Sequence, residues 1–237
     1  MQPYLDGRYA RDNPGWHAED APHKARAVHA VLTRLGWRRG LILDVGCGTG
    51  DVLRELASLG GAADEPPRWE GWDPFAPLRP ETRGVRLVPR DPLRERPPAD
   101  VALCLDVLEH LEAPGPALEA LVAIAPRVVL RIPLEVSLRD VLRPAAALEA
   151  RRRYGHLHHW SRATALAMLQ ERGLTPVDVG LDRVPVAPAS PTGWPTEIAR
   201  RLAARAGATR AADLLGGFSV IVAAVAERPG GNRVDGG

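Results

Sequence analysis

The chain has 237 residues, of which 45% are hydrophobic and 25% are charged, a balance close to that of an average globular protein. This composition excludes a largely disordered chain, so we expect a single domain over residues 1–228 and a disordered, Gly-rich tail over residues 229–237. The 31 basic and 29 acidic residues leave a net charge of only +2, which argues against a polyanionic partner such as nucleic acid.

The first predicted element is a helix over residues 22–35, within an N-terminal cap segment over residues 1–39, because its apolar residues recur at helical spacing. From about residue 40 onward, apolar strand-like runs alternate with helix-like segments, which is typical of a doubly wound, mostly parallel sheet. The strands are expected at residues 41–45, 69–72, 85–88, 101–105, 128–132, 175–181 and 218–226. The further helices are expected at residues 51–59, 116–125 and 161–172.

Two long connections, residues 134–160 and 185–217, interrupt this alternation and are predicted to be lid-like insertions. Cys47 and Cys104 lie in apolar runs without a CxxC pair, so we expect reduced, structural cysteines. The chain begins without an apolar signal segment and contains no run of about 18 uncharged apolar residues, so the expected location is cytoplasmic, with no membrane contact.

The residues from Leu41 to Asp51 read LILDVGCGTGD, an apolar strand that runs directly into a Gly-rich turn and then a helix. Glycines at positions 46, 48 and 50 let a ligand approach the backbone and reach the amide groups at the helix N-terminus. A dinucleotide fingerprint, GxGxxG, would need its third glycine at Asp51. The spacing therefore favours a nucleoside-binding loop and disfavours a nicotinamide-dependent dehydrogenase.

This segment resembles the first motif of the class I S-adenosylmethionine-dependent methyltransferases, which looks like LDVGCGTG. The resemblance implies S-adenosylmethionine as the cofactor and S-adenosylhomocysteine as its product. It also implies a Rossmann-like α/β fold, with a doubly wound, mostly parallel seven-stranded sheet, an antiparallel C-terminal strand and helices on both faces. Within this loop, the residues that the resemblance implies in cofactor binding are Asp44, Gly46, Cys47, Gly48 and Gly50.

Two acidic residues extend the resemblance beyond the loop. Asp73, followed by Pro74, stands after the second expected strand, where the family has a carboxylate that accepts hydrogen bonds from both ribose hydroxyls. Asp91, followed by Pro92, stands after the third strand, at the family's position for bonding the adenine amine. A solvated loop acid is the alternative interpretation of Asp91, because aspartate is common in turns.

After the fourth expected strand, the segment DVLEHL resembles the family's VLEHL, which lines the methionine end of the cofactor site. It implies that Asp106, Val107 and His110 contact the cofactor, while Glu109 and His110 also fix the position of the following helix. With the later run YGHLHHWSRATALAMLQERGL, the resemblance covers roughly residues 40–180 in the family's order.

The run YGHLHHW supplies three candidates for a general base, His156, His158 and His159, because an imidazole can take a proton from a hydroxyl or amine acceptor near neutral pH. A packed loop rich in histidine and tryptophan is the alternative interpretation. We expect no metal site, since no acidic cluster or His-x3-His helix lies nearby in the sequence.

The acceptor itself is not identified, although a small molecule is the expected partner. Its selection is predicted to reside in residues 4–23 and in the two insertions, with flat apolar walls from Trp16, Tyr154, Trp160 and Trp194. His17 is a further candidate base in the first of these segments. The alternatives are a nucleic-acid or protein methyltransferase and a non-catalytic S-adenosylmethionine-binding protein. For the nucleic-acid alternative, the chain lacks the Asn/Asp-Pro-Pro-aromatic element that acts on flipped bases.

Overall fold

The computed structural model describes residues 11, 15, 18–60, 65–75, 84–142, 145–183 and 207–227. These residues build one seven-stranded sheet with the strand order β3-β2-β1-β4-β5-β7-β6. The strands are β1 (Leu41–Val45), β2 (Arg68–Trp72), β3 (Val85–Val88), β4 (Val101–Leu105), β5 (Arg127–Leu134), β6 (Leu174–Arg183) and β7 (Phe218–Ala226). Strand β7 runs antiparallel to both of its neighbours, and the other strands run parallel to one another, so the predicted fold class is confirmed.

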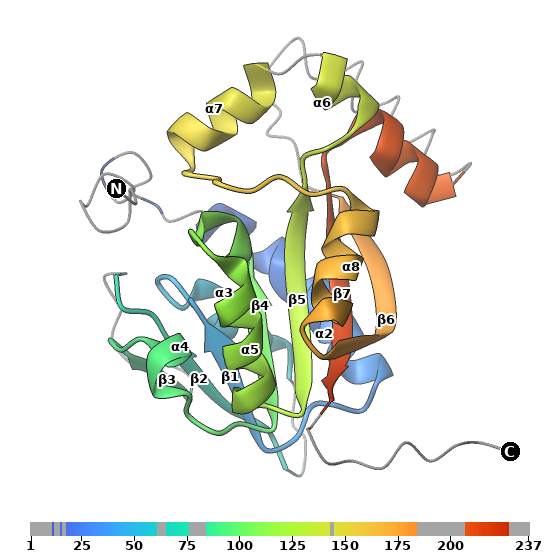
Figure 1. Cartoon of the computed structure of the whole chain (residues 1–237). Helices are drawn as coiled ribbons and strands as arrows, with labels where there is room; N and C mark the ends of the chain where they lie inside the picture. The colour runs from blue at the N-terminus through green and yellow to red at the C-terminus, as the bar shows by residue number, and fades with distance from the viewer. Residues whose placement is uncertain are drawn as a thin grey trace, which may run out of the picture.

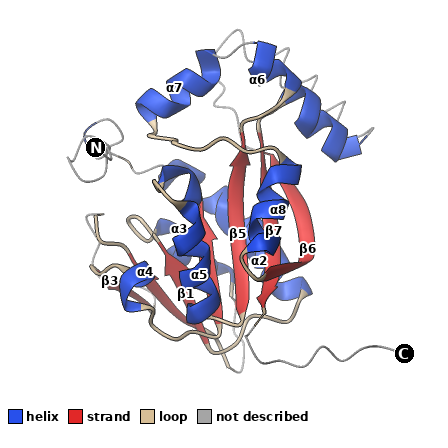
Figure 2. Cartoon of the chain, in the orientation of Figure 1, coloured by secondary structure: helices blue, strands red, loops and turns tan. Residues whose placement is uncertain are grey.

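Helices cover both faces of the sheet (Figures 1 and 2). On one face, α2 (Ala21–Arg34) and α3 (Asp51–Leu59) pack over a core that includes strands β1 and β4. On the other face lie α5 (Pro114–Ile124) and α8 (Arg162–Glu171). The helix α2 buries Ala25, Val28 and Leu32, the spacing that puts one stripe of a helix against a core. The short 3-10 helix η1 (Ala18–Asp20) precedes α2, and none of the described helices is long and apolar enough to cross a membrane.

The strand β5 continues past the predicted end at Ile132, through Pro133, to Leu134. Proline cannot donate a hydrogen bond to a ladder, so it rarely continues a strand that is paired on both sides. The pairing with β4 ends at Arg131, whereas the pairing with β7 continues to Leu134. Pro133 therefore stands where one side of β5 is an open edge, and strand edges tolerate proline.

The first insertion is more ordered than the sequence indicated. Residues 134–160 contain two helices, α6 (Leu138–Leu142) and α7 (Ala145–Arg153), which lie above the carboxyl end of β5 (Figure 1). Trp160 then returns to form a bridge with Leu134. Since β1 and β5 are both parallel to β4, this insertion lies at the same sheet edge as the Gly-rich loop. That position is the one a lid would need, and the lid role itself stays a prediction.

The second insertion, predicted over residues 185–217, is described only in its last part. Residues 207–215 form a helix, and Ala211 and Ala212 in it are buried against the core. Residues 185–206, which include Trp194, lie outside the described residues, as do Tyr4, Trp16, His17 and the predicted tail over residues 229–237. Two further short helices follow strands without having been predicted: α4 (Pro92–Glu95) and the 3-10 helix η2 (Leu108–His110).

Candidate functional site

The loop between β1 and α3 has a backbone that only glycine adopts readily. Gly46, Gly48 and Gly50 have φ angles of 76°, 54° and 81°. A Cβ atom on Gly46 would lie 2.8 Å from a methyl carbon of Val107, and one on Gly50 would lie 2.8 Å from a methyl carbon of Leu87. The glycines therefore permit both the left-handed turn and the close approach of neighbouring side chains, and Gly50 begins α3.

Asp73 lies beside this loop although it comes from the end of the next strand. The Gly48 amide donates to Oδ2 of Asp73 at 3.0 Å, and the Phe75 amide donates to Oδ1 at 2.8 Å. The Asp73 side chain is buried. The Gly46 amide donates to the Trp72 carbonyl at 2.9 Å, and this bond joins the carboxyl ends of β1 and β2. The structure thus brings the predicted ribose-binding carboxylate and the predicted nucleoside loop into contact.

Asp44 is a buried acid near the carboxyl end of β1, two residues before the first glycine of the loop. Burial, and next the charge of Asp73, raises the pKa of Asp44 to about 7, while the Lys24 ammonium opposes this shift. Its Oδ1 has no hydrogen-bond partner among the described residues. At neutral pH this carboxyl can therefore hold or release a proton, and it leaves one acceptor available at the base of the loop.

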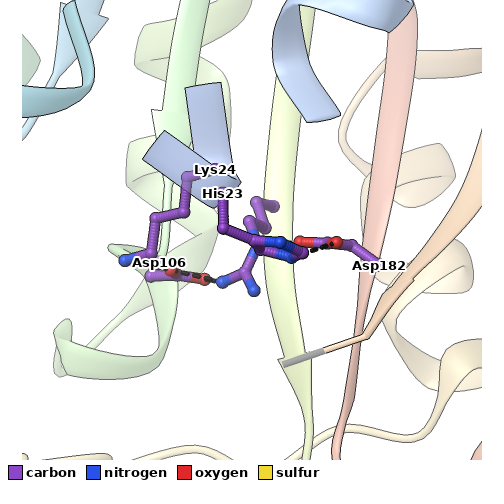
Figure 3. Close-up of polar contacts among 5 residues, drawn as sticks. His23, Lys24, Asp106 and Asp182 are labelled. Atoms are coloured by element: carbon purple, nitrogen blue, oxygen red, sulfur yellow. Dashed lines mark hydrogen bonds and ion pairs between the residues drawn. The ribbon is translucent and has the colours of Figure 1, made fainter. Parts of the chain in front are cut away.

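Five polar and charged side chains form one network that links α2, β5 and β6 to the end of β4. Arg131, in the middle of β5, donates from Nη1 to Asp106 at 2.6 Å and from Nε to Asp182 at 2.8 Å. Lys24 lies 2.8 Å from Asp106, and His23 lies 2.7 Å from Asp182, so each carboxylate has a second partner from the start of α2 (Figure 3). Burial alone would raise the pKa of Asp106, but the charges of Arg131 and Lys24 hold it well below its usual range.

This charged network fixes the segment that follows β4. Asp106 has a φ of 56°, a left-handed conformation that aspartate tolerates better than most residues, and its amide donates to the Arg131 carbonyl at 2.9 Å. The next residue, Val107, is the one that contacts the loop at Gly46. The predicted contact residues Asp106 and Val107 are therefore held against the Gly-rich loop.

Glu109 and His110 follow in η2, where Glu109 is fully buried and His110 is partly buried. Burial, and next the charge of Asp106, raises the pKa of Glu109 well above its usual range. Burial and the neighbouring His156 lower the pKa of His110 to about 3, so His110 is neutral at physiological pH. The rings of His110 and His156 meet edge to face, with their centroids 4.9 Å apart.

The three candidate histidines do not share one environment. His156 and His159 each place Nδ1 at 2.8 Å from a different oxygen of Glu135, at the end of β5. His158 instead places Nε2 at 2.9 Å from the Leu111 carbonyl, and its ring stacks on Trp160. The packed-loop interpretation therefore describes His158, whereas His156 and His159 remain candidate bases oriented by a carboxylate.

Residues 17–179 match the model of a known protein family, described as a methyltransferase domain. The chain belongs to this methyltransferase family. No curated protein matches the chain by sequence.

Solved methyltransferase structures share the fold at low sequence identity. Magnesium protoporphyrin IX methyltransferase from Synechocystis, with bound S-adenosylhomocysteine, is 19% identical with a TM-score of 0.56, over 87% of this chain and 83% of that one. The Burkholderia thailandensis 1,6-didemethyltoxoflavin-N1-methyltransferase is 17% identical with a TM-score of 0.53, over 95% and 84% of the two chains. A putative methyltransferase of Haloferax volcanii, in complex with the Trm112 activator, is 16% identical with a TM-score of 0.60, over 95% and 96%.

In this methyltransferase, Asp91 already has a local role. Its Oδ1 accepts from the Leu93 amide at 3.0 Å and so caps α4, while Arg94 lies 3.3 Å from its Oδ2. Pro92 occupies the first turn of that helix, where proline fits best. Capping and starting α4 therefore account for the presence of Asp91 and Pro92, and the contact of Asp91 with adenine remains a prediction.

The sequence did not predict several side chains of this methyltransferase site. Arg131 gave a usable signal, because a charged residue interrupts the otherwise apolar strand and so needs a buried partner. Lys24 is the only lysine in the chain, but nothing local indicated that it would meet Asp106. Asp182 and Glu135 gave no signal, since their partners lie far away in the sequence. Cys47 and Cys104 are free and buried, as expected.

The raised pKa of Asp44 predicts a pH effect on the methyltransferase without cofactor. Since the folded-state pKa of about 7 exceeds the ordinary value of 3.8, the stabilising effect of the Asp44 proton is complete below about pH 4 and is lost as the pH rises to 7. The variant Asp44→Asn lacks this titration. Between pH 5 and pH 8 the parent should therefore lose about 2–3 kcal/mol of its free energy of unfolding relative to Asp44→Asn. This loss corresponds to a fall of roughly 4–12 °C in the Tm of the parent relative to that of the variant. Thermal unfolding at both pH values measures this fall, and a pH-independent difference would contradict it.

Proposed function

We propose that this methyltransferase uses S-adenosylmethionine to methylate a small-molecule acceptor. The observation that carries the proposal is the contact between the Gly48 amide and Asp73 at 3.0 Å, which joins the glycine loop and a buried carboxylate at the carboxyl edge of the sheet. Ligands of open α/β sheets bind at this edge. The S-adenosylmethionine and S-adenosylhomocysteine sites of similar folds support the same choice of cofactor.

The proposed cofactor contacts follow from the positions of the side chains. Asp73 can accept hydrogen bonds from the ribose hydroxyls, and the glycine loop allows the nucleoside to approach the backbone amides. The methionine end would then lie near Asp106 and Val107, which the charged network holds against Gly46. The remaining proposed contacts are Asp44, Cys47, Gly48, Gly50, Pro74, Asp91, Pro92 and His110.

The sulfonium group of S-adenosylmethionine supplies an electrophilic methyl carbon when it is bound. The protein then has to hold the acceptor in line with that carbon and exclude water, and such orientation accounts for roughly 7–11 kcal/mol of a barrier. His156 and His159 are the proposed bases, because the shared carboxylate of Glu135 orients both rings. The insertion with α6 and α7 follows β5 at the same edge, so it is proposed to cover the acceptor.

A small acceptor is favoured over a nucleic acid because the charges of the chain nearly balance. Similar folds act on different molecules, as the names magnesium protoporphyrin IX methyltransferase and 1,6-didemethyltoxoflavin-N1-methyltransferase state. The fold therefore does not specify the acceptor, and the side chains around the site must select it.

An acceptor screen tests the proposal. The full chain is incubated with S-adenosylmethionine that carries a trideuterated methyl group and with panels of phenols, carboxylic acids, amines and thiols. We expect one panel to gain the mass of a trideuteromethyl group, with equimolar S-adenosylhomocysteine. Transfer only to RNA, DNA or protein would replace the small-molecule proposal. Cofactor binding without transfer to any acceptor would favour a non-catalytic binding protein.

A further inference from the structure

Glu109 is fully buried, and no other residue that the structure describes bonds its side chain. Its side chain has no exposed surface, and neither carboxylate oxygen has a hydrogen-bond partner among the described residues. An uncompensated carboxylate is unfavourable to bury, and a protonated carboxyl would still leave a buried donor and acceptor unpaired. A buried polar group of this kind indicates a ligand or an ion that completes its coordination.

The surroundings of Glu109 indicate which ligand fits. Potential ligand atoms of Glu109, His110 and His156 all lie within 4.8 Å of one another. Glu109 and His110 are neighbours in η2, whereas His156 comes from the segment after α7. Two imidazoles and one carboxylate form a set that binds transition metals in catalytic sites, with coordination positions left for water or substrate.

The fold holds these three side chains in place without the ion. The Leu157 amide donates to the Glu109 carbonyl at 2.7 Å, and the His158 amide lies 3.3 Å from the same oxygen, which ties the histidine segment to η2. Glu135 holds Nδ1 of His156 at 2.8 Å and so leaves Nε2 as the remaining ring nitrogen. A carboxylate behind a metal-binding imidazole is the usual arrangement, because it fixes the ring and its tautomer.

We propose that Glu109, His110 and His156 bind one divalent transition-metal ion, with Glu135 as the positioning residue behind His156. The set does not suit magnesium, which prefers oxygen ligands. The expectation of no metal site rested on the missing acidic partner in the local sequence, and the fold supplies that partner from the segment after β4.

The inference deepens the proposed function and rests on it for the role of the ion. The proposed site begins two residues after Val107, which contacts the cofactor loop, so an ion there would lie near the methyl donor. A metal ion lowers the pKa of a bound hydroxyl group. The acceptor class would then be a hydroxyl compound. Its proton would pass to His159 or to solvent, because His156 binds the ion in this proposal and does not act as a base. The hydroxyl oxygen forms the new bond to the methyl carbon, while the carbon–sulfur bond breaks and its electron pair stays on sulfur.

Cobalt binding tests the site without any acceptor. The untagged full chain is stripped with a chelator, dialysed and titrated with Co²⁺, whose visible absorption reports coordination by the protein. We expect saturation at one equivalent. In Glu109→Gln and in His156→Asn the affinity should fall at least about 100-fold, and in Glu135→Gln by about 10- to 100-fold. The matched control is His158→Asn, because His158 bonds the Leu111 carbonyl outside the cluster, and it should bind Co²⁺ as the parent does.

Binding of S-adenosylhomocysteine to each sample separates the two proposals. A parent chain that binds S-adenosylhomocysteine but gives no cobalt band overturns the metal site and leaves the proposed function standing. Equal cobalt affinity in the parent and in His156→Asn also overturns the site. If Glu109→Gln fails to fold, His156→Asn decides the question, since His156 is less buried. A cobalt site in a chain that does not bind S-adenosylhomocysteine would instead overturn the proposed function.

Discussion

Replacing Arg131 with methionine is expected to lower the free energy of unfolding by about 3–5 kcal/mol, the cost of removing one partner from a buried ion pair. The Arg131 side chain is 5% exposed, and its guanidinium bonds both Asp106 and Asp182. Methionine fills part of the same volume but leaves two buried carboxylates with only Lys24 and His23 as partners. The loss is therefore electrostatic, and it should appear as a fall in Tm of roughly 6–20 °C.

The matched control is Arg172→Met. Arg172 lies 2.6 Å from Glu119, but both side chains are about half exposed, so this pair should contribute no more than about 1 kcal/mol. A triple variant that combines Arg131→Met with Asp106→Asn and Asp182→Asn should recover part of the lost stability, because it removes the unpaired charges as well. Denaturant unfolding measures all three proteins. Equal losses for Arg131→Met and Arg172→Met would show that the network contributes little.

The parts of the fold that the sequence predicted depend on local patterns. The apolar run of β1 and its glycine loop are specified by residues that are adjacent in the chain, and the positive φ angles of the loop explain the glycines. The start of α8 is equally local, because Ser161 and Thr164 cap that helix reciprocally. The predicted end of β5 at Ile132 was wrong, because the effect of Pro133 depends on where the pairing with β4 stops.

The parts of the site that the sequence did not predict depend on contacts between distant segments. Glu135 bonds His156 and His159, which follow the α6 and α7 helices in the sequence. Asp182 bonds His23, which lies 159 residues earlier in the chain. An unpartnered carboxylate such as Glu109 also has no sequence signature, because only the packed structure shows which groups lack partners. The motifs therefore predicted which residues gather around the glycine loop, whereas the contacts of the histidine segment become visible only in the packed structure.

Replacing Asp73 with alanine is expected to weaken S-adenosylhomocysteine binding by about 1.5–3 kcal/mol, a rise in Kd of roughly 10- to 150-fold. The substitution removes the charged acceptor proposed for the ribose hydroxyls. It also removes the contacts with the amides of Gly48 and Phe75, which hold the loop in place. Calorimetric titration of the variant and the parent gives the ratio of the two Kd values.

Two further variants distinguish a ribose contact from a loop contact. Asp73→Asn keeps one amide-accepting oxygen but loses the charge, so its Kd should lie between those of the parent and Asp73→Ala. Glu171→Ala removes an exposed acid at the end of α8 and should bind as the parent does. If Asp73→Ala bound S-adenosylhomocysteine as tightly as the parent, Asp73 would have only the structural role of bonding the loop amides.

We propose that the loop at residues 46–50 and Asp73 together form the methyl-donor site. The most direct measurement is a calorimetric titration of S-adenosylhomocysteine into the full parent chain, with NAD⁺ as the competing nucleotide. We predict saturable binding at one site with a Kd in the micromolar range, about −8 kcal/mol, together with a rise in Tm as the ligand concentration increases. Heat from NAD⁺ binding with none from S-adenosylhomocysteine would contradict the claim.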